Sequence, residues 1–308
     1  MATEGAPTGP QAHRRGPSLA LFALFAALVL AAACAPRTAP MASTEVAVAP
    51  RRSVGCDAAV ATTEPDRLFV AGQERTFLAR MPAGPATVPR DLVIAFHGRT
   101  NDAAQVRRYF GLDAALPEAI VVYPRALQAT SNTFAWADRG DPPDRQRDFA
   151  LVDDLIARFG AAHCLDLDRV FVVGHSLGAY FANDVACRLG DRIRAVASVA
   201  GGVQGDGCAG GVAALLVHHP DDRLVRMSEG LAARDAFLSA NGLGAAPSTP
   251  VAGGALARLR CARHGDAGTA DPVVWCARDD ATTPRGLDPH TWPTGTAAAI
   301  AAFFAGLP

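Results

Sequence analysis

The sequence predicts an α/β fold with a mostly parallel, doubly wound sheet, and three observations lead to that class. Residues 92–96, which follow Asp91, and residues 170–173 form continuous apolar runs, which are typical of strands that are buried on both faces. Amphipathic stretches, such as residues 149–159 and 177–189, alternate with these runs and indicate helices. A chain of 308 residues with 50% hydrophobic residues is long enough for a single domain with a large core.

Residues 174–178 read Gly-His-Ser-Leu-Gly, the G-x-S-x-G pattern of a nucleophile elbow. In such an elbow the serine lies on a strained turn between a strand and a helix, and side chains two positions away on either side would clash. The simpler alternative is an ordinary Gly-Ser turn. We predict that Ser176 is a nucleophile and that the backbone N–H of Leu177 donates to an oxyanion hole.

The N-terminus resembles an export signal. Residues 13–15 contain two arginines, residues 18–33 are uncharged and apolar, and three alanines precede Cys34. The apolar run is short for a membrane span, and small residues before a cysteine resemble the bacterial lipidation motif. We expect a signal peptide over residues 1–33 and a lipid on Cys34, with plain signal cleavage as the alternative.

Residues 34–55 are rich in Ala, Pro, Thr and Ser and indicate a flexible tether, so the catalytic domain is expected over residues 56–308. If Cys34 carries a lipid, an even number of cysteines remains for disulfides in an oxidising compartment. No pair is spaced C-x-x-C, and no metal is expected. The remaining cysteines are Cys56, Cys164, Cys187, Cys208, Cys261 and Cys276.

The charge pattern limits the partners. The formal net charge is −1, and no basic cluster is strong enough to follow a phosphate backbone, so nucleic acid is excluded. Contact with a membrane is expected only through a lipid on Cys34. We expect a monomer in the cell envelope or a freely secreted protein.

Upstream of the elbow, residues 68–70 and 76–78 predict a hairpin, and the strand 91–96 ends at His97-Gly98. The loop after this strand is expected to donate the second N–H of the oxyanion hole. Arg99 is the first choice for that donor, with Thr100 as the alternative.

The strand 213–218 ends beside two aspartates, Asp221 and Asp222. Functional groups lie at the carboxyl ends of strands in doubly wound sheets, and this elbow type has its acid after the serine and before the base. Asp222 is preferred over Asp221. His218 and His219 are not expected to hold a metal, because consecutive strand residues point to opposite faces.

After the acid, only two histidines remain, His264 and His290. Residues 255–259 and 273–276 predict the last two strands, and residues 294–304 predict the final helix. His264 precedes a predicted strand whereas His290 follows the last one, so His290 is the expected base. A surface histidine is the alternative.

With these residues in place, residues 91–304 resemble the secreted esterase family that contains polyhydroxybutyrate depolymerases and feruloyl esterases of the carbohydrate-esterase type. The matching segments include VIAFHG, CLDLDRVFVVGHSLGA, VHHPDDRLV and HTWP. Family members commonly have Gly-Gly-His close after the last strand, where this chain has residues 279–282, Asp-Asp-Ala-Thr. A longer loop before His290 is therefore expected.

The resemblance implies an α/β-hydrolase fold and an exported serine esterase that needs no cofactor. Its substrates would be feruloyl or acetyl esters or hydroxyalkanoate oligomers, as small molecules or polymers. Trp136, in the long loop 130–147, either stacks on a substrate ring or anchors the loop. The displaced histidine keeps open an alternative, a non-catalytic surface lipoprotein that uses the fold as a binding module.

The topology of the expected fold also suggests a disulfide pattern. Cys164 precedes the nucleophile strand and Cys187 ends the helix that returns from it, which suggests that these two pair. The remaining expected pairs are Cys261 with Cys276 and Cys56 with Cys208.

Overall fold

The protein divides into two units, Met1–Ala47 and Val48–Pro308, and the described residues all lie in the second unit. The predicted signal peptide, Cys34 and most of the predicted tether lie outside the described residues. Among the helices that are described, none is both long and apolar enough to cross a membrane. The computed structural model describes residues 50–57, 66–130, 133–137, 147–204, 207–244, 246–266, 268–279 and 289–308.

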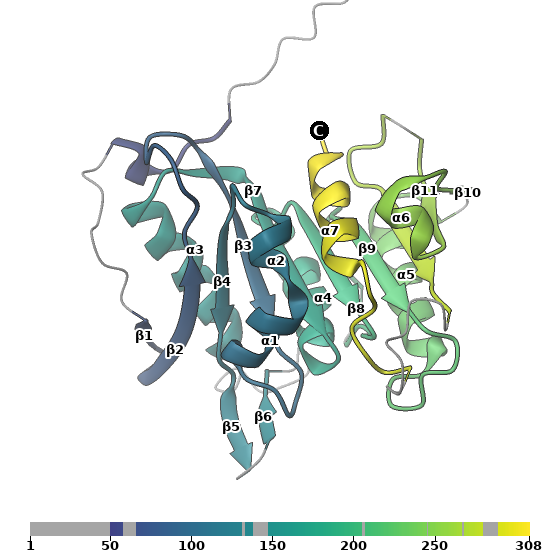
Figure 1. Cartoon of the computed structure of the whole chain (residues 1–308), viewed down its shortest axis with the longest axis horizontal. Coiled ribbons are helices and arrows are strands. Elements are labelled where there is room, and N and C mark those ends of the chain that lie inside the picture. Colours follow the sequence, from purple (N-terminus) through teal and green to yellow (C-terminus); the bar gives the residue numbers. More distant parts are fainter. Residues whose placement is uncertain are drawn as a thin grey trace, which may run out of the picture. The chain divides into compact units, whose positions relative to one another are not determined.

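A large sheet organises the described residues, and its six central strands, from β4 to β12, run parallel (Figure 1). Antiparallel strands complete both edges. The predicted α/β fold with a mostly parallel sheet is therefore confirmed. In spatial order the strands are β1 (Arg67–Val70), β2 (Gln73–Arg80), β4 (Ile120–Pro124), β3 (Arg90–Phe96), β7 (Leu165–His175), β8 (Ala195–Val199), β9 (Ala213–His218), β12 (Val273–Ala277), β11 (Cys261–His264) and β10 (Ser248–Pro250).

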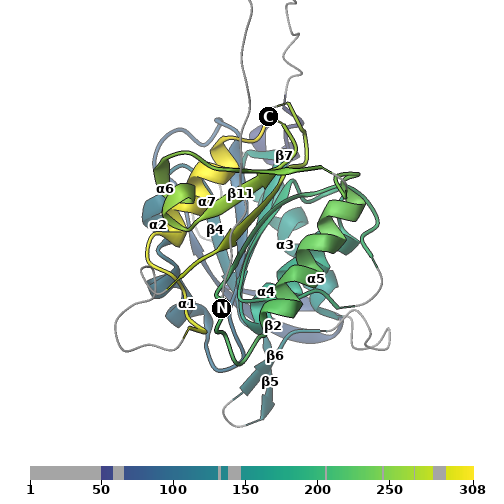
Figure 2. The same cartoon turned by 90° about the vertical axis from the view of Figure 1, so that its right-hand side faces the viewer.

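Helices cover both faces of this sheet (Figure 2). In β3, Leu92, Ile94 and Phe96 pack in one hydrophobic core, and Val93 and Ala95 pack in the other. Because alternate side chains of a strand point to opposite faces, a doubly covered strand has no polar face, which explains the continuous apolar run. One face carries α3 (Arg147–Ala162), α4 (Leu177–Arg188) and α5 (Met227–Ala240), and the other carries α1 (Ala103–Phe110), α2 (Leu112–Ala115), α6 (Gly254–Arg258) and α7 (Thr296–Ala305).

Several elements differ from the expectation or were not expected. The predicted strand over residues 255–259 is the helix α6, and the strand that follows it, β11, contains His264. The apolar residues of this segment fit one face of a short helix as well as a strand, and Leu259 is buried against the α7 side of the sheet. The elements that were not expected include η1 (Val54–Asp57), the helices α1 and α2, the edge strand β10, and the hairpin of β5 (Leu127–Thr130) and β6 (Thr133–Ala135).

Two of the three expected disulfide pairs are wrong. The structure joins Cys56 to Cys164 and Cys187 to Cys208. The N-terminal segment runs beside the start of β7, where the Ser53 N–H donates to the Leu165 carbonyl, and this places η1 against Cys164. The sequence contains no sign of that contact.

The third pair, Cys261 with Cys276, agrees with the prediction. These residues lie directly opposite each other on the antiparallel strands β11 and β12. Three disulfides among the described residues fit an exported protein, because such bonds persist in oxidising compartments.

Candidate active site

The predicted elbow joins β7 to α4, and Ser176 has the strained backbone angles φ 57° and ψ −126°. A Cβ at Gly174 would lie 2.1 Å from the carbonyl oxygen of Gly178, and a Cβ at Gly178 would lie 2.2 Å from the carbonyl oxygen of Phe96. Both distances are far below van der Waals contact. The two glycines therefore allow the strand, the turn and the neighbouring strand β3 to approach this closely.

The structure brings the three predicted catalytic residues together. His290 Nε2 lies 2.8 Å from Ser176 Oγ, and His290 Nδ1 lies 2.8 Å from Asp222 Oδ2. The carboxylate on His290 is that of Asp222, whereas Asp221 is exposed. A serine hydroxyl, an imidazole and a carboxylate are thus arranged in hydrogen-bond contact, which is the arrangement of a Ser-His-Asp triad.

Asp222 is buried, with 4% of its surface exposed. Its Oδ1 accepts hydrogen bonds of 2.9 Å from the backbone N–H groups of Leu224 and Val225. Burial alone would raise the pKa of this carboxyl, but the hydrogen bonds with His290 and with these two N–H groups outweigh burial and hold the pKa below its ordinary value. Asp222 therefore stays ionised at neutral pH.

The segment around His290 is fixed by Arg278, which has 1% of its surface exposed. The Arg278 guanidinium donates to the carbonyl oxygens of Pro289 and Thr291, the residues on either side of His290. The Arg278 backbone N–H donates to the His218 carbonyl at 3.0 Å, which ties this segment to the end of β9. Nothing in the sequence distinguishes this arginine from the many others.

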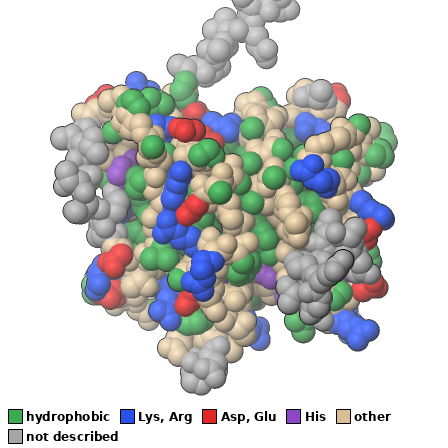
Figure 3. Space-filling model, viewed as in Figure 1, with side chains coloured by type: hydrophobic (Ala, Val, Ile, Leu, Met, Phe, Trp, Pro, Cys, Tyr) green, Lys and Arg blue, Asp and Glu red, His purple; other side chains and the backbone are tan. Residues whose placement is uncertain are grey.

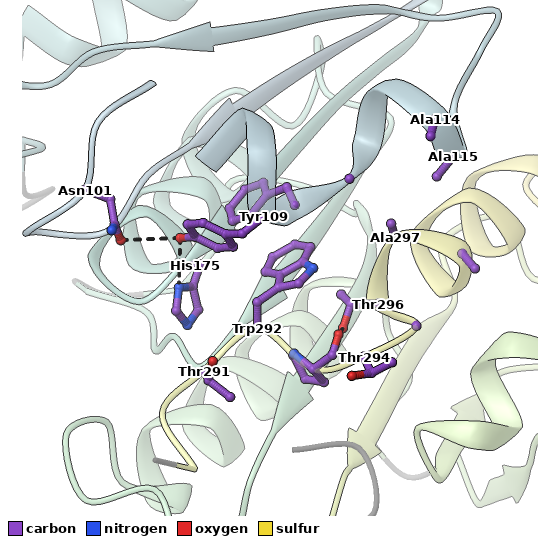
Figure 4. Close-up of a pocket in the computed structure, with 15 residues that line it drawn as sticks. Asn101, Tyr109, Ala114, Ala115, His175, Thr291, Trp292, Thr294, Thr296 and Ala297 are labelled. Atoms are coloured by element: carbon purple, nitrogen blue, oxygen red, sulfur yellow. Dashed lines mark hydrogen bonds between the residues drawn. The ribbon is translucent and has the colours of Figure 1, made fainter. Parts of the chain in front are cut away.

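A second histidine, His175, packs against His290. Its ring stacks on that of His290 with 5.3 Å between ring centroids. The Tyr109 hydroxyl donates to Asn101 Oδ1 and lies 3.2 Å from His175 Nδ1 (Figure 4). Burial, followed by the nearby His290, lowers the pKa of His175 to about 3, so this ring is neutral at physiological pH. The sequence analysis did not single out His175, although it occupies a variable position of the elbow motif.

The predicted oxyanion donors also lie around Ser176. Leu177, Arg99 and Thr100 line the same pocket as Ser176, which has a volume of about 720 Å³. Leu177 is the first residue of α4, and the first N–H groups of a helix have no acceptor within the helix. Arg99 and Thr100 both remain candidates for the second donor.

Buried His97 fixes the start of this loop through hydrogen bonds to the backbone. Its Nδ1 donates to the Gly98 carbonyl at 2.7 Å, and its Nε2 accepts from the Ala126 N–H at 3.0 Å. Burial lowers the pKa of His97 to about 4, which keeps the ring neutral and suited to these two bonds.

Trp136 does not line the Ser176 pocket, and its contacts favour the second of its two expected roles, the anchor of its loop. Its indole is buried, donates from Nε1 to the His97 carbonyl at 2.8 Å, and stacks on Phe181 with 5.1 Å between ring centroids. Trp136 anchors its loop because a buried indole N–H needs a partner, and the end of β3 supplies one.

The part of the chain that the structure describes contains no group of three or more His, Cys, Asp or Glu side chains that could hold a metal ion. His218 and His219 instead make local contacts. His218 Nε2 donates to the Val225 carbonyl at 2.9 Å, and His219 Nδ1 accepts from the Asp221 N–H at 3.0 Å.

The space-filling view shows arginine and acidic side chains scattered in small groups over the described surface (Figure 3). No extended basic face is visible in this view. This agrees with the near-zero net charge of the chain.

A doubly wound sheet with a serine on the turn between its central strand and the next helix defines an α/β-hydrolase fold. Solved structures support this class. Acetyl xylan esterase from Aspergillus awamori superposes with a TM-score of 0.54 at 14% identity, covering 78% of this chain and 98% of that chain. A thermostable esterase superposes with a TM-score of 0.53 at 18% identity, covering 77% and 60%.

The sequence relatives are esterases and a depolymerase. Feruloyl esterase D from Neurospora crassa is 27% identical over 71% of this chain and 78% of its own length. NocK from Nocardia uniformis, provisionally named an esterase, is 33% identical over 61% of this chain and 57% of its own length. Poly(3-hydroxyalkanoate) depolymerase C from Paucimonas lemoignei is 32% identical over 40% of this chain and 30% of its own length.

These relatives confirm the resemblance to the esterase family that contains feruloyl esterases and polyhydroxyalkanoate depolymerases. The chain spans only 57% of the length of NocK. No family model matches the sequence.

Proposed function

We propose that this protein is an exported serine esterase that hydrolyses carboxylic esters through Ser176, His290 and Asp222. The observation that carries the proposal is the position of the His290 ring, which lies 2.8 Å from both the serine oxygen and the carboxylate. The distance between the base and the serine also distinguishes an enzyme from a non-catalytic binding module, because a catalytic base must lie within hydrogen-bond distance of its nucleophile. A distance this short favours the enzyme.

The first half of the reaction forms an acyl-enzyme. His290 takes the proton of the Ser176 hydroxyl as the oxygen attacks the ester carbonyl carbon, and Asp222 holds the imidazole in the tautomer that can accept this proton. The N–H of Leu177, together with that of Arg99 or Thr100, stabilises the negative charge on the carbonyl oxygen. The tetrahedral intermediate collapses when His290 returns the proton to the oxygen of the leaving alcohol.

The second half releases the acid. His290 removes a proton from water, which attacks the acyl carbon, and the proton then returns to the oxygen of Ser176 as the carboxylic acid leaves. No cofactor takes part in either half. The Asp222 carboxylate stays charged throughout, because the hydrogen bonds that it accepts keep its pKa below the ordinary value.

Feruloyl or acetyl esters and hydroxyalkanoate oligomers are the proposed substrate classes, in keeping with the names of the relatives. The protein acts as a monomer in the cell envelope or outside the cell, after removal of residues 1–33. A lipid on Cys34 holds the envelope form, and residues 34–55 form the tether between that lipid and the catalytic domain, residues 56–308. The disulfides support an oxidising compartment.

Labelling with a fluorophosphonate probe tests the proposal, since the probe reacts only with an activated serine. Wild type is expected to label and to hydrolyse p-nitrophenyl acetate or methyl ferulate, and Ser176→Ala and His290→Ala are expected to lose both activities. If folded wild-type protein neither labels nor hydrolyses any ester, the esterase proposal is rejected and the binding-module alternative is favoured.

Two neighbouring aspartates offer a matched pair of variants. Asp222→Asn should lower kcat by about 10⁴-fold, because an amide on Nδ1 selects the wrong imidazole tautomer. Asp221→Asn removes a carboxylate one position away that does not contact the base, and kcat should stay within about twofold of wild type. Equal losses in both variants would contradict the role proposed for Asp222.

A further inference from the structure

A second cavity lies beside the candidate active site, and the reaction proposed above does not use it. Its volume is about 840 Å³, which is within the range of small-molecule pockets. Residues of α1 and α2 form one wall, and the segment that leads from Thr291 into α7 forms the opposite wall (Figure 4). We call it the α1–α7 cavity.

The α1–α7 cavity adjoins the Ser176 pocket. Asn101 and His175 line both spaces. His175 directly precedes the nucleophile, and Thr291, which lines the cavity, directly follows the base His290. The two pockets therefore share part of their walls, directly beside Ser176 and His290.

The walls of the α1–α7 cavity are mainly aromatic and aliphatic. Tyr109, Phe110 and Trp292 supply rings, and Trp292 stacks on Phe110 with 3.9 Å between ring centroids. Among the described residues that line it, none is an aspartate, glutamate, lysine or arginine, and His175 is uncharged because burial lowers its pKa to about 3. The other polar side chains are those of Asn101, Thr291, Thr294 and Thr296. Aliphatic surface comes from Ala114, Ala115, Ala297 and Ala298.

The Ser176 pocket has a different character. Arg99, Gln204 and Glu229 line it, and Tyr180 lies close enough to Glu229 that burial and this carboxylate together raise the pKa of the phenol to about 12. The two adjoining spaces therefore offer one polar and one apolar environment to the two parts of an ester.

We propose that the α1–α7 cavity binds the alcohol portion of the ester and that this portion is apolar, an alkyl chain or an aryl group. The inference rests on the proposed function. The base must hand its proton to the leaving oxygen, so the alcohol lies next to His290, and Thr291 and Trp292 continue from that residue into the cavity wall. A sugar alcohol would bury several hydroxyl groups against a wall made mainly of rings and methyl groups, which is costly.

Two variants that fill the α1–α7 cavity test the inference. Ala297→Leu narrows it from α7, and Ala114→Phe narrows it from α2, where the side chain is exposed and folding tolerates a larger group. Ala302→Leu is the matched control, because Ala302 is an exposed alanine on the same helix and does not line the cavity.

The measured quantity is the ratio of kcat/KM for hexyl acetate to kcat/KM for methyl acetate, with the acyl group held constant. Wild type should prefer the hexyl ester by tenfold or more, and both filled variants should lower the ratio by about tenfold, since a few methylene groups in an apolar pocket are worth that much. Ala302→Leu should keep the wild-type ratio. The ratio of kcat/KM for p-nitrophenyl butyrate to that for p-nitrophenyl acetate measures the preference for the acyl group, with the alcohol group held constant.

An unchanged alcohol preference in both filled variants would overturn the inference, as would a change that follows the acyl chain instead. Fluorophosphonate labelling of the same preparations separates this result from failure of the proposed function. Labelled enzyme with an unchanged ratio rejects the cavity assignment alone, whereas folded protein that does not label rejects the esterase and the assignment together.

Discussion

The proposed nucleophile and the proposed base are held in place in different ways. Ser176 owes its position to five consecutive residues, in which two glycines allow strand, turn and helix to meet. His290 owes its position to groups from distant parts of the chain, including Asp222, Arg278 and His175. A position that neighbours in sequence determine is visible in the sequence, whereas one that tertiary contacts determine emerges only on folding.

The local position of the nucleophile should be the easier one to destroy. In Gly178→Ala, the new Cβ would lie 2.2 Å from the Phe96 carbonyl oxygen and 2.6 Å from that of His97, so β3 or the elbow must move. We expect fluorophosphonate labelling and ester hydrolysis to fall by about a thousandfold, because a shift of this size misplaces the nucleophile and the oxyanion donors.

Gly210→Ala is the control for this change, since nothing lies within 4 Å of its Cβ. Circular dichroism establishes that both variants are folded. Labelling of folded Gly178→Ala at the wild-type rate would mean that the elbow tolerates a side chain at this position. The claim that the glycines of the elbow determine the position of Ser176 would then be wrong.

Acid should weaken the loop that starts next to the nucleophile. His97 has a pKa of about 4 in the folded protein because it is buried, against an ordinary value of 6.5. Between these values the unfolded chain binds more protons than the native protein, so the free energy of unfolding falls as pH decreases from about 6.5 to about 4, by about 3 kcal/mol for this residue.

Urea unfolding at pH 7, 5.5 and 4 measures this dependence. His97→Gln should show a shallower decrease than wild type across the window, and His264→Gln, which changes a half-exposed histidine, serves as the control. Identical slopes for wild type and His97→Gln would show that the buried ring is not the source of the acid sensitivity.

Loss of a single contact that positions the base should have a smaller effect than the change at the elbow, because several groups hold His290 in place. Arg278→Met removes both hydrogen bonds to the carbonyls that flank His290, and we expect kcat to fall by about thirtyfold while KM for p-nitrophenyl acetate changes little. Arg278 does not line the Ser176 pocket, which is why substrate binding should be spared.

Arg278→Lys keeps the charge and one donor and should recover part of kcat, which simple loss of stability would not explain. Arg108→Met, an exposed arginine, controls for loss of positive charge. A rise in KM at constant kcat would show that Arg278 acts on substrate binding instead of on the base.

The same contrast explains how much could be predicted from the sequence. The parallel strands were visible because a doubly covered strand is apolar throughout, and His290 was chosen from chain order and from its place after the last predicted strand. Arg278 was missed because its role depends on two carbonyl oxygens that reach it only in the folded chain. The disulfide of Cys164 was assigned wrongly for the same reason, since its partner lies 108 residues away in a segment with no strand pattern.

A change at Trp136 should have the smallest effect, because this residue anchors its loop and does not line the Ser176 pocket. Trp136→Phe keeps the ring against Phe181 but loses the hydrogen bond to the His97 carbonyl, so the free energy of unfolding should fall by about 1 kcal/mol. The ratio of kcat/KM for methyl ferulate to that for methyl acetate should stay at the wild-type value, because the indole does not line the Ser176 pocket. A severalfold fall in that ratio at unchanged stability would mean that Trp136 reaches the acyl group, and selectivity would then depend on a residue anchored beneath the oxyanion loop.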